Sequence, residues 1–282
     1  MSQQTSHLPE AHVRAANRAG GSSFYFAMRI LRRDQREAMF EIYSFCRAVD
    51  DIADSDTPRG WRMDRLVNWR QDIAAIYEGR VLPEREGLAD AIRRFSLHRQ
   101  DFLAIIDGME MDASADIRAP DVAKLELYCD RVACAVGRLS VCVFGMEERE
   151  GRGLAHHLGL ALQFTNILRD IDEDAAIGRL YLPREALQLA NIVTTDLLST
   201  ISDARLGIAC TFLADVARDH FAKSEEIMSG CPRHVVRAPK IMAEVYRQIL
   251  EDMIVRGWTA PRRRVHAHKL HLLWVALRHA VI

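Results

Sequence analysis

The chain has 282 residues, of which 49% are hydrophobic, so it can bury one large core or two smaller ones. Its formal net charge of -1 argues against nucleic acid as the main partner, because no basic field attracts a phosphate backbone. The six cysteines form no C-x-x-C pair and several lie in apolar segments, which indicates reduced, buried thiols in a cytoplasmic protein. The polar opening does not resemble a signal peptide, and no apolar run reaches membrane-spanning length.

Apolar residues recur at intervals of three and four along almost the whole chain, which predicts helices rather than strands. Residues 1–20 are polar and are expected to be disordered. No shift in composition marks a domain boundary, so we predict a single all-α domain over residues 21–282. Proline- and glycine-containing breaks separate the predicted helices, which cover residues 22–54, 60–78, 86–95, 99–112, 121–145, 149–175, 203–229, 235–256 and 263–280.

A polar stripe follows the end of the first predicted helix. Tyr43, Arg47, Asp50 and Asp54 stand at i, i+4, i+7 and i+11, on one helical face. Two aspartates four residues apart repel each other by a few tenths of a kcal/mol, so we expect something outside the helix to offset the repulsion. For this segment taken alone, a solvated surface stripe is an equally good interpretation.

A second stripe lies about 120 residues further along, in the predicted helix 149–175. It consists of Gln163, Asn166, Asp170 and Asp174, at i, i+3, i+7 and i+11, and it also ends in two aspartates four residues apart. The neighbouring residues are apolar, which predicts a largely buried helix, and an unpaired buried charge is very costly. We therefore expect the two stripes to face each other across a central cavity.

Four facing carboxylates with oxygen-rich neighbours suit Mg²⁺, which commonly shares its coordination with the phosphate oxygens of a substrate. Arg47, Arg169 and Arg179 lie near the stripes and would neutralise the rest of a diphosphate. A di-iron carboxylate bundle requires a Glu-x-x-His motif, and neither stripe contains a histidine. The adjacent His156 and His157 are interpreted as a surface or packing pair.

Four segments resemble the squalene and phytoene synthase family, in order and over most of the chain. They are "SSFYFAMRIL" at 22–31, "YSFCRAVDDIAD" at 43–54, "YCDRVACAVGRLS" at 128–140 and "ALQFTNILRDIDEDAAIGRLYLP" at 161–183. The resemblance implies the all-α isoprenoid-synthase fold, three Mg²⁺ ions and the head-to-head joining of two prenyl diphosphates. Within the family, "DGMEMD" at 107–112 and other segments look most like the bacterial members that make presqualene diphosphate for hopanoids.

That resemblance implies farnesyl diphosphate as substrate, no requirement for NADPH, and downstream enzymes of the hopanoid pathway as partners. Phytoene or dehydrosqualene synthesis is the nearest alternative activity. A terpene cyclase or a chain-elongating prenyltransferase shares the fold class but is less consistent with the second stripe and with "GRLYLP" at 178–183. A helical scaffold protein of the same fold is the non-enzymatic alternative, and loss of the aspartates would mark it.

The family resemblance also implies roles for individual residues. Metal would be held by the four stripe aspartates together with Asn166, and diphosphate by the three arginines. Tyr128 matches the active-site tyrosine and is a candidate proton acceptor beside the released diphosphate, although it could equally be a core residue. Further lining positions are Ser23, Phe24, Tyr43, Gln163 and Tyr181.

Three features remain open in the sequence. The chain has Ala133-Cys134 where the family has Ala-Gly, and we expect the thiol to narrow the prenyl channel. The acidic residues of "DGMEMD" are interpreted as a helix end. Residues 262–282 predict a basic amphipathic helix, which could make peripheral contact with the inner face of the membrane or simply pack on the core.

Overall fold

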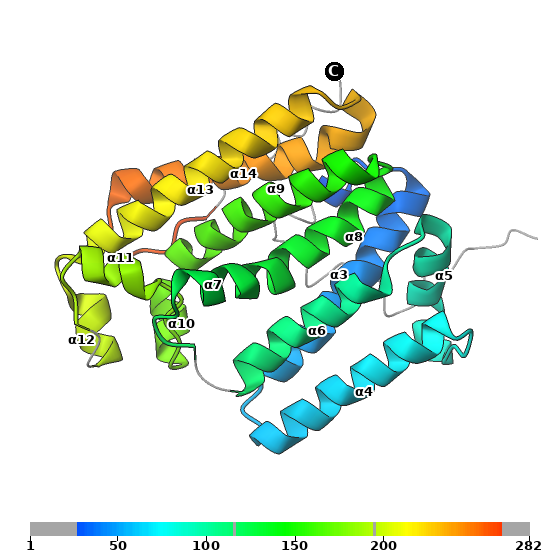
Figure 1. Cartoon of the computed structure of the whole chain (residues 1–282), viewed down its shortest axis with the longest axis horizontal. Helices are drawn as coiled ribbons and strands as arrows, with labels where there is room; N and C mark the ends of the chain where they lie inside the picture. The colour runs from blue at the N-terminus through cyan, green and yellow to red at the C-terminus, as the bar shows by residue number, and fades with distance from the viewer. Residues whose placement is uncertain (1–26, 115–116, 194–195, 267–282) are drawn as a thin grey trace, which may run out of the picture.

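The computed structural model describes residues 27–114, 117–193 and 196–266 and arranges them as layered helices (Figure 1). Helices α13 and α14 pack on α9, α9 packs on α8, and α6 joins α8 to α3 and α4. The longer helices are α3 (Arg33–Ala53), α4 (Arg59–Tyr77), α5 (Glu86–Phe95), α6 (Arg99–Ser114), α8 (Ala135–Phe144), α9 (Glu148–Arg169), α13 (Leu206–Ser229) and α14 (Arg233–Arg256). The predicted all-α class is confirmed.

The first predicted helix, 22–54, is interrupted, although the apolar periodicity of the sequence predicted a continuous helix there. Residues 29–31 form a turn and a bend, and α3 begins at Arg33. Arg32 is the N-cap of α3, and Asp34 lies in its first turn, where the helix dipole favours an anion.

The predicted helix 121–145 is continuous but not uniform. It comprises α7 (Val122–Cys129), a π-helical turn (Asp130–Cys134) and α8. A π turn inserts one extra residue into the helical repeat and often occurs at functional sites. The side chains beyond it therefore point in directions that a regular helix would not predict.

The predicted helix 149–175 bends at Asp170, between α9 and α10 (Ile171–Ala176). Arg169 donates from Nε and Nη2 to the Asp170 carboxylate at 2.7 and 2.6 Å. Adjacent residues do not face each other on a regular helix, so this bidentate pair accompanies the bend. Two short helices that the sequence did not predict follow, α11 (Arg184–Leu189) and α12 (Leu197–Ser202).

An isolated parallel bridge between Arg118 and Leu180 joins the segment before α7 to the segment after α10. The backbone N–H of Leu180 donates to Ile117 at 2.8 Å, and the N–H of Ala119 donates to Leu180 at 2.8 Å. These backbone hydrogen bonds hold the stretch that carries Arg179 and Tyr181 against residues 117–119, which follow α6 in the chain.

The predicted C-terminal helix, 263–280, does not begin where we expected. Residues 259–266 are irregular, and the rest of the predicted helix lies outside the described residues. The Arg262 side chain is only 5% exposed and pairs with Asp172 at 2.5 Å, while Arg264 reaches Asp170 at 2.8 Å. Two of the basic residues assigned to a membrane surface are therefore paired with acidic residues of α10 and its N-terminal boundary.

Candidate active site

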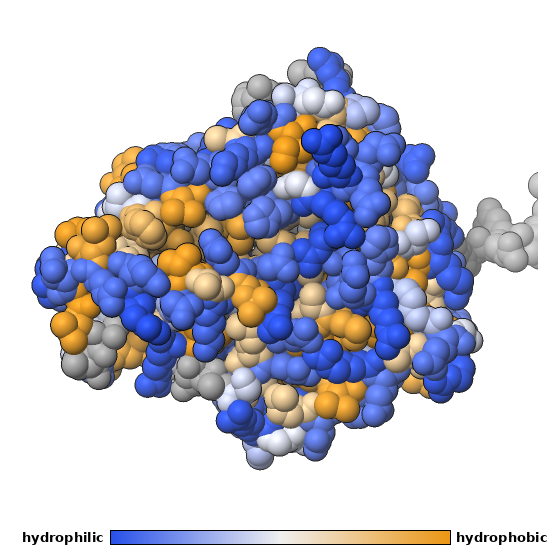
Figure 2. Space-filling model, in the orientation of Figure 1, coloured by the Kyte–Doolittle hydropathy of each residue, from blue (hydrophilic) through white to orange (hydrophobic). Residues whose placement is uncertain are grey.

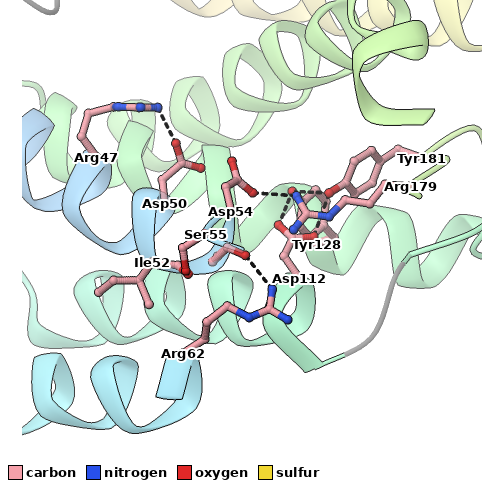
Figure 3. Close-up of polar contacts among 11 residues, drawn as sticks. Arg47, Asp50, Ile52, Asp54, Ser55, Arg62, Asp112, Tyr128, Arg179 and Tyr181 are labelled. Atoms are coloured by element: carbon pink, nitrogen blue, oxygen red, sulfur yellow. Dashed lines mark hydrogen bonds and ion pairs between the residues drawn. The ribbon is translucent and has the colours of Figure 1, made fainter. Parts of the chain in front are cut away.

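The first aspartate stripe lies where α3 ends. Asp54 directly follows the last helical residue, and its carboxylate accepts a bond from Arg179 at 2.8 Å (Figure 3). Arg47 donates to Asp50 at 2.5 Å and to Asp51 at 2.7 Å. The helix end is secured by Arg62, which donates to the Ala53 carbonyl at 2.9 Å. No lysine or arginine lies between Asp50 and Asp54 in the sequence, and the charges of these two aspartates are compensated instead by Arg47 and Arg179.

The second stripe ends at the bend between α9 and α10. Asp170 is paired with Arg169 and Arg264, both within 3 Å. Among the described residues, no side-chain donor contacts the Asp174 carboxylate. Burial, together with the charge of Asp170, raises the pKa of Asp174 to about 7.

The two stripes act on each other electrostatically. Burial raises the pKa of Asp50 to about 6, with repulsion from Asp54 as the next cause. The charge of Asp54, on α3, also raises the pKa of Asp174, whereas the charge of Arg179 lowers it. Arg179, which donates to Asp54, therefore lies near carboxylates of both stripes.

Asp112, at the end of α6, joins this group although the sequence suggested only an acidic helix end. The Tyr128 hydroxyl donates to its Oδ2 at 2.8 Å and the Tyr181 hydroxyl to its Oδ1 at 2.7 Å (Figure 3). The two tyrosine rings are stacked, with centroids 4.9 Å apart. By contrast, Asp107 and Glu110 both pair with Arg70 and belong to the α4–α6 contact.

Burial controls the protonation of this Asp112–tyrosine cluster. It raises the pKa of Tyr128 well above the usual value, and the charge of Asp112 adds to the effect. Burial also raises the pKa of Asp112, against the opposing charge of Arg179 and the two hydroxyl donors. Tyr128 is therefore a neutral phenol whose proton is directed at a carboxylate.

The donor set fits Mg²⁺. All five proposed ligands offer oxygen, which this hard cation prefers, and the buried Asn166 Oδ1 atom has no hydrogen-bond partner in the part of the chain that the structure describes. Such an orphaned acceptor is costly unless a cation or donor meets it. Among the described residues, the clusters with three ligand atoms within 4.8 Å of one another do not include these aspartates. The arrangement is open, as Mg²⁺ requires when it keeps waters and shares phosphate oxygens.

An apolar cavity of about 270 Å³ lies behind the second stripe, between α3, α8, α9 and α14. Tyr43, Gln163 and Asn166 line it and connect it to the aspartates one or two turns away. Most of its other walls are apolar, including Met28, Met39, Val132, Leu158, Leu162 and Met242. Tyr128 and Tyr181 do not line this cavity, and the expected positions Ser23 and Phe24 lie outside the described residues.

The expectation that Cys134 narrows the prenyl channel is wrong. The π turn directs its side chain to α9, where the thiol donates to the His156 carbonyl at 3.4 Å. A Cβ on Gly159 would lie 2.9 Å from the Cys134 Cα and Sγ atoms, so a glycine there allows this close contact. Ala133 and Gly137 do line the cavity. The small residues thus serve both helix packing and cavity space.

The outer surface adds little that is specific to this site. Figure 2 shows a mostly hydrophilic face, with hydrophobic side chains gathered near the end formed by α11 and α12, which carry the exposed Leu189 and Leu198. Among the described helices, none combines the length and apolar character that a membrane crossing requires. All six cysteines are free thiols, as the sequence predicted.

The two aspartate stripes share Arg179, and helices α3 and α9, which carry most of these residues, also line the apolar cavity. The chain belongs to the squalene/phytoene synthase family, whose model matches residues 17–271.

Relatives with a named activity match nearly the whole chain. It is 55% identical to the presqualene diphosphate synthase of Rhodopseudomonas palustris, over 97% of both chains. It is 53% identical to the enzyme of the same name from Sinorhizobium fredii, over 96% of this chain and 98% of that one. Among solved structures, the squalene synthase from Alicyclobacillus acidocaldarius is similar, with 25% identity, a TM-score of 0.79, and coverage of 89% of this chain and 94% of that one.

Proposed function

We propose that this protein joins two farnesyl diphosphates head to head and releases diphosphate to give presqualene diphosphate. The observation that carries the proposal is a pair of aspartate stripes on helices that also line an apolar cavity, where the buried Asn166 Oδ1 atom has no hydrogen-bond partner among the described residues. The identity of 50–55% to proteins named presqualene diphosphate synthase supports this product over phytoene.

The residues divide the work between the head and the tail of the substrate. Asp50, Asp54, Asp170, Asp174 and Asn166 would hold Mg²⁺, which when bound stabilises the negative charge of the departing diphosphate. Arg47, Arg169 and Arg179 keep guanidinium donors for diphosphate oxygens beyond those used on the aspartates. The cavity walls exclude water from the allylic carbon while the diphosphate leaves, which protects a cationic centre from hydrolysis.

Closure of the cyclopropane requires loss of one proton from C1 of a prenyl chain. Tyr128 is too weak an acid to serve as a phenolate, because burial and Asp112 raise its pKa. Its hydroxyl oxygen can accept a proton only while it passes its own proton along the 2.8 Å bond to Asp112. We therefore propose that Tyr128 accepts the C1 proton while its own proton moves to Asp112, in competition with the released diphosphate as the acceptor.

Product analysis tests the proposal. Purified protein is incubated with Mg²⁺ and either farnesyl or geranylgeranyl diphosphate, with and without NADPH. We expect presqualene diphosphate and one free diphosphate from farnesyl diphosphate, unchanged by NADPH. Squalene that forms only with NADPH would make the protein a full squalene synthase. A C40 product, with farnesyl diphosphate inert, would make it a phytoene synthase.

We also propose that the protein works at the inner face of the membrane, where the amphiphilic product leaves for downstream hopanoid enzymes. The exposed apolar residues of α11 and α12 support this, together with the basic residues beyond Arg264. Co-sedimentation with anionic vesicles measures it, and binding that does not weaken with salt, or no binding, would contradict it.

A further inference from the structure

Three imidazoles meet on the seam between two long helices, away from the site described above. His156 and His157 lie on α9 and His220 lies on α13. One ring nitrogen from each lies within 4.8 Å of the others, and the Nδ1 atoms of His157 and His220 are 2.9 Å apart. No residue of α13 lines the cavity, so this histidine cluster is separate from it.

We propose that His156, His157 and His220 form a binding site for a divalent transition metal, with Zn²⁺ as the best match. Neutral imidazole is a preferred ligand of zinc, and three protein ligands leave a fourth position open for water. Ligand nitrogens at the usual zinc distance of about 2.0–2.1 Å in a tetrahedron are about 3.3–3.4 Å apart. The 2.9 Å between the His157 and His220 Nδ1 atoms and the upper limit of 4.8 Å for the three nitrogens bracket that value, so small rotations of the rings complete the site.

The surroundings hold the three rings in place. The α9 and α13 backbones pack along their length, and the edge of Phe164 contacts His220 with ring centroids 6.0 Å apart. His157 and His220 are half-buried, whereas His156 is exposed and leaves the site open to solvent. Lys223 and Asp219 place one charge of each sign near His220, so they do not strongly favour or oppose a cation.

A second cluster, Asp130, Cys134 and His156, competes for the same histidine. Its carboxylate already accepts a bond from Arg138 at 2.8 Å. Its thiol is buried, which raises the pKa of Cys134 to about 12 and keeps the sulfur protonated, whereas zinc binds the thiolate. The three histidines, which need no deprotonation to coordinate, are therefore the better ligand set.

Zinc competition between the untagged full-length protein and a chromogenic chelator tests the site. The chain has eleven histidines, so the readout is the binding lost in His156→Ala, His157→Gln and His220→Gln relative to His234→Ala. His234 is exposed on α14, outside the cluster, and is the matched control. Loss of a direct ligand should weaken zinc binding at least as much as loss of an outer partner, by about 10–100-fold.

A thermal melt gives a second readout that does not depend on prenyl chemistry. Zinc should raise the melting temperature of the unchanged protein and of His234→Ala by mass action, and this rise should disappear in His156→Ala, whose exposed side chain is not needed for folding. Equal zinc affinity in all variants, or no zinc uptake by the unchanged protein, would leave only a hydrogen-bonded histidine pair and overturn the proposal.

Discussion

Asp112, which is buried, and Asp174, which is half-buried, both lie near Arg179, but they differ in their hydrogen-bond donors. Asp112 receives hydroxyl donors from Tyr128 and Tyr181 at 2.8 and 2.7 Å. Asp174 receives no side-chain donor from the described residues, and burial raises its pKa to about 7. A carboxylate that accepts hydrogen bonds from side chains of the protein can orient those side chains. A carboxylate that lacks such donors, and so has an unmet charge, is available to a cation from outside.

The largest expected effect comes from removing an aspartate of the two stripes, whether it lacks a side-chain donor, as Asp174 does, or is paired with Arg47, as Asp50 is. Asp174→Asn and Asp50→Asn should each lower the rate of presqualene diphosphate formation by about 10²–10³-fold, as loss of one electrostatic stabiliser does in other enzymes. Asp215→Asn, on the exposed face of α13, is the control for a lost surface carboxylate. Steady-state rates at saturating Mg²⁺ measure the difference. Rates of the Asp174 and Asp50 variants that match the control would refute their role.

Removing one of the tyrosine hydroxyls that donate to Asp112 should lower the rate less, and the two tyrosines should differ in the size of the loss. If Tyr128 passes the C1 proton to Asp112, Tyr128→Phe lowers the rate by about 10²-fold, at the low end for general acid–base groups. Tyr181→Phe removes an equivalent hydrogen bond to the same carboxylate and is the matched control. Equal losses in the two variants would mean that both hydroxyls only position Asp112 and that diphosphate takes the proton.

Asp112→Asn should lower the rate by about 10²-fold, as much as Tyr128→Phe, because an amide keeps an acceptor for one tyrosine but cannot take up its proton. Its effect should fall on the turnover number, with substrate affinity nearly unchanged, since Asp112 is not expected to bind metal. A loss that appears only in the Michaelis constant, and not in turnover, would place Asp112 among the ligands instead.

The metal-free protein should show the cost of the unmet charge as an effect on stability. The pKa of Asp174 is raised on folding from about 3.8 to about 7, so its ionisation destabilises the fold increasingly as pH rises between those values. In a chelator, Asp174→Asn should therefore melt a few degrees higher than the unchanged protein at pH 8, since about 1 kcal/mol moves such a domain by roughly 2–4 °C. The gain should vanish toward pH 4. A gain that is constant with pH would contradict the charge explanation.

Local patterns predicted the two stripes, because residues four apart on a helix stay together whatever the tertiary structure. They could not predict Asp112, whose partners Tyr128 and Tyr181 stand 16 and 69 residues away. The direction of Cys134 depended on a π turn, which changes the helical phase and leaves no mark in the apolar periodicity. The interruption before α3 was missed because the apolar periodicity continues across it.

Binding of an unreactive farnesyl thiodiphosphate, followed by calorimetry with Mg²⁺ or with a chelator, tests most directly whether Asp50 and Asp174 hold metal and diphosphate together. The account predicts that binding requires Mg²⁺, that Asp50→Asn and Asp174→Asn abolish it, and that Asp112→Asn retains it. Equal affinity with Mg²⁺ and with chelator, or loss in Asp112→Asn but not in Asp174→Asn, would contradict the distinction between the two acids.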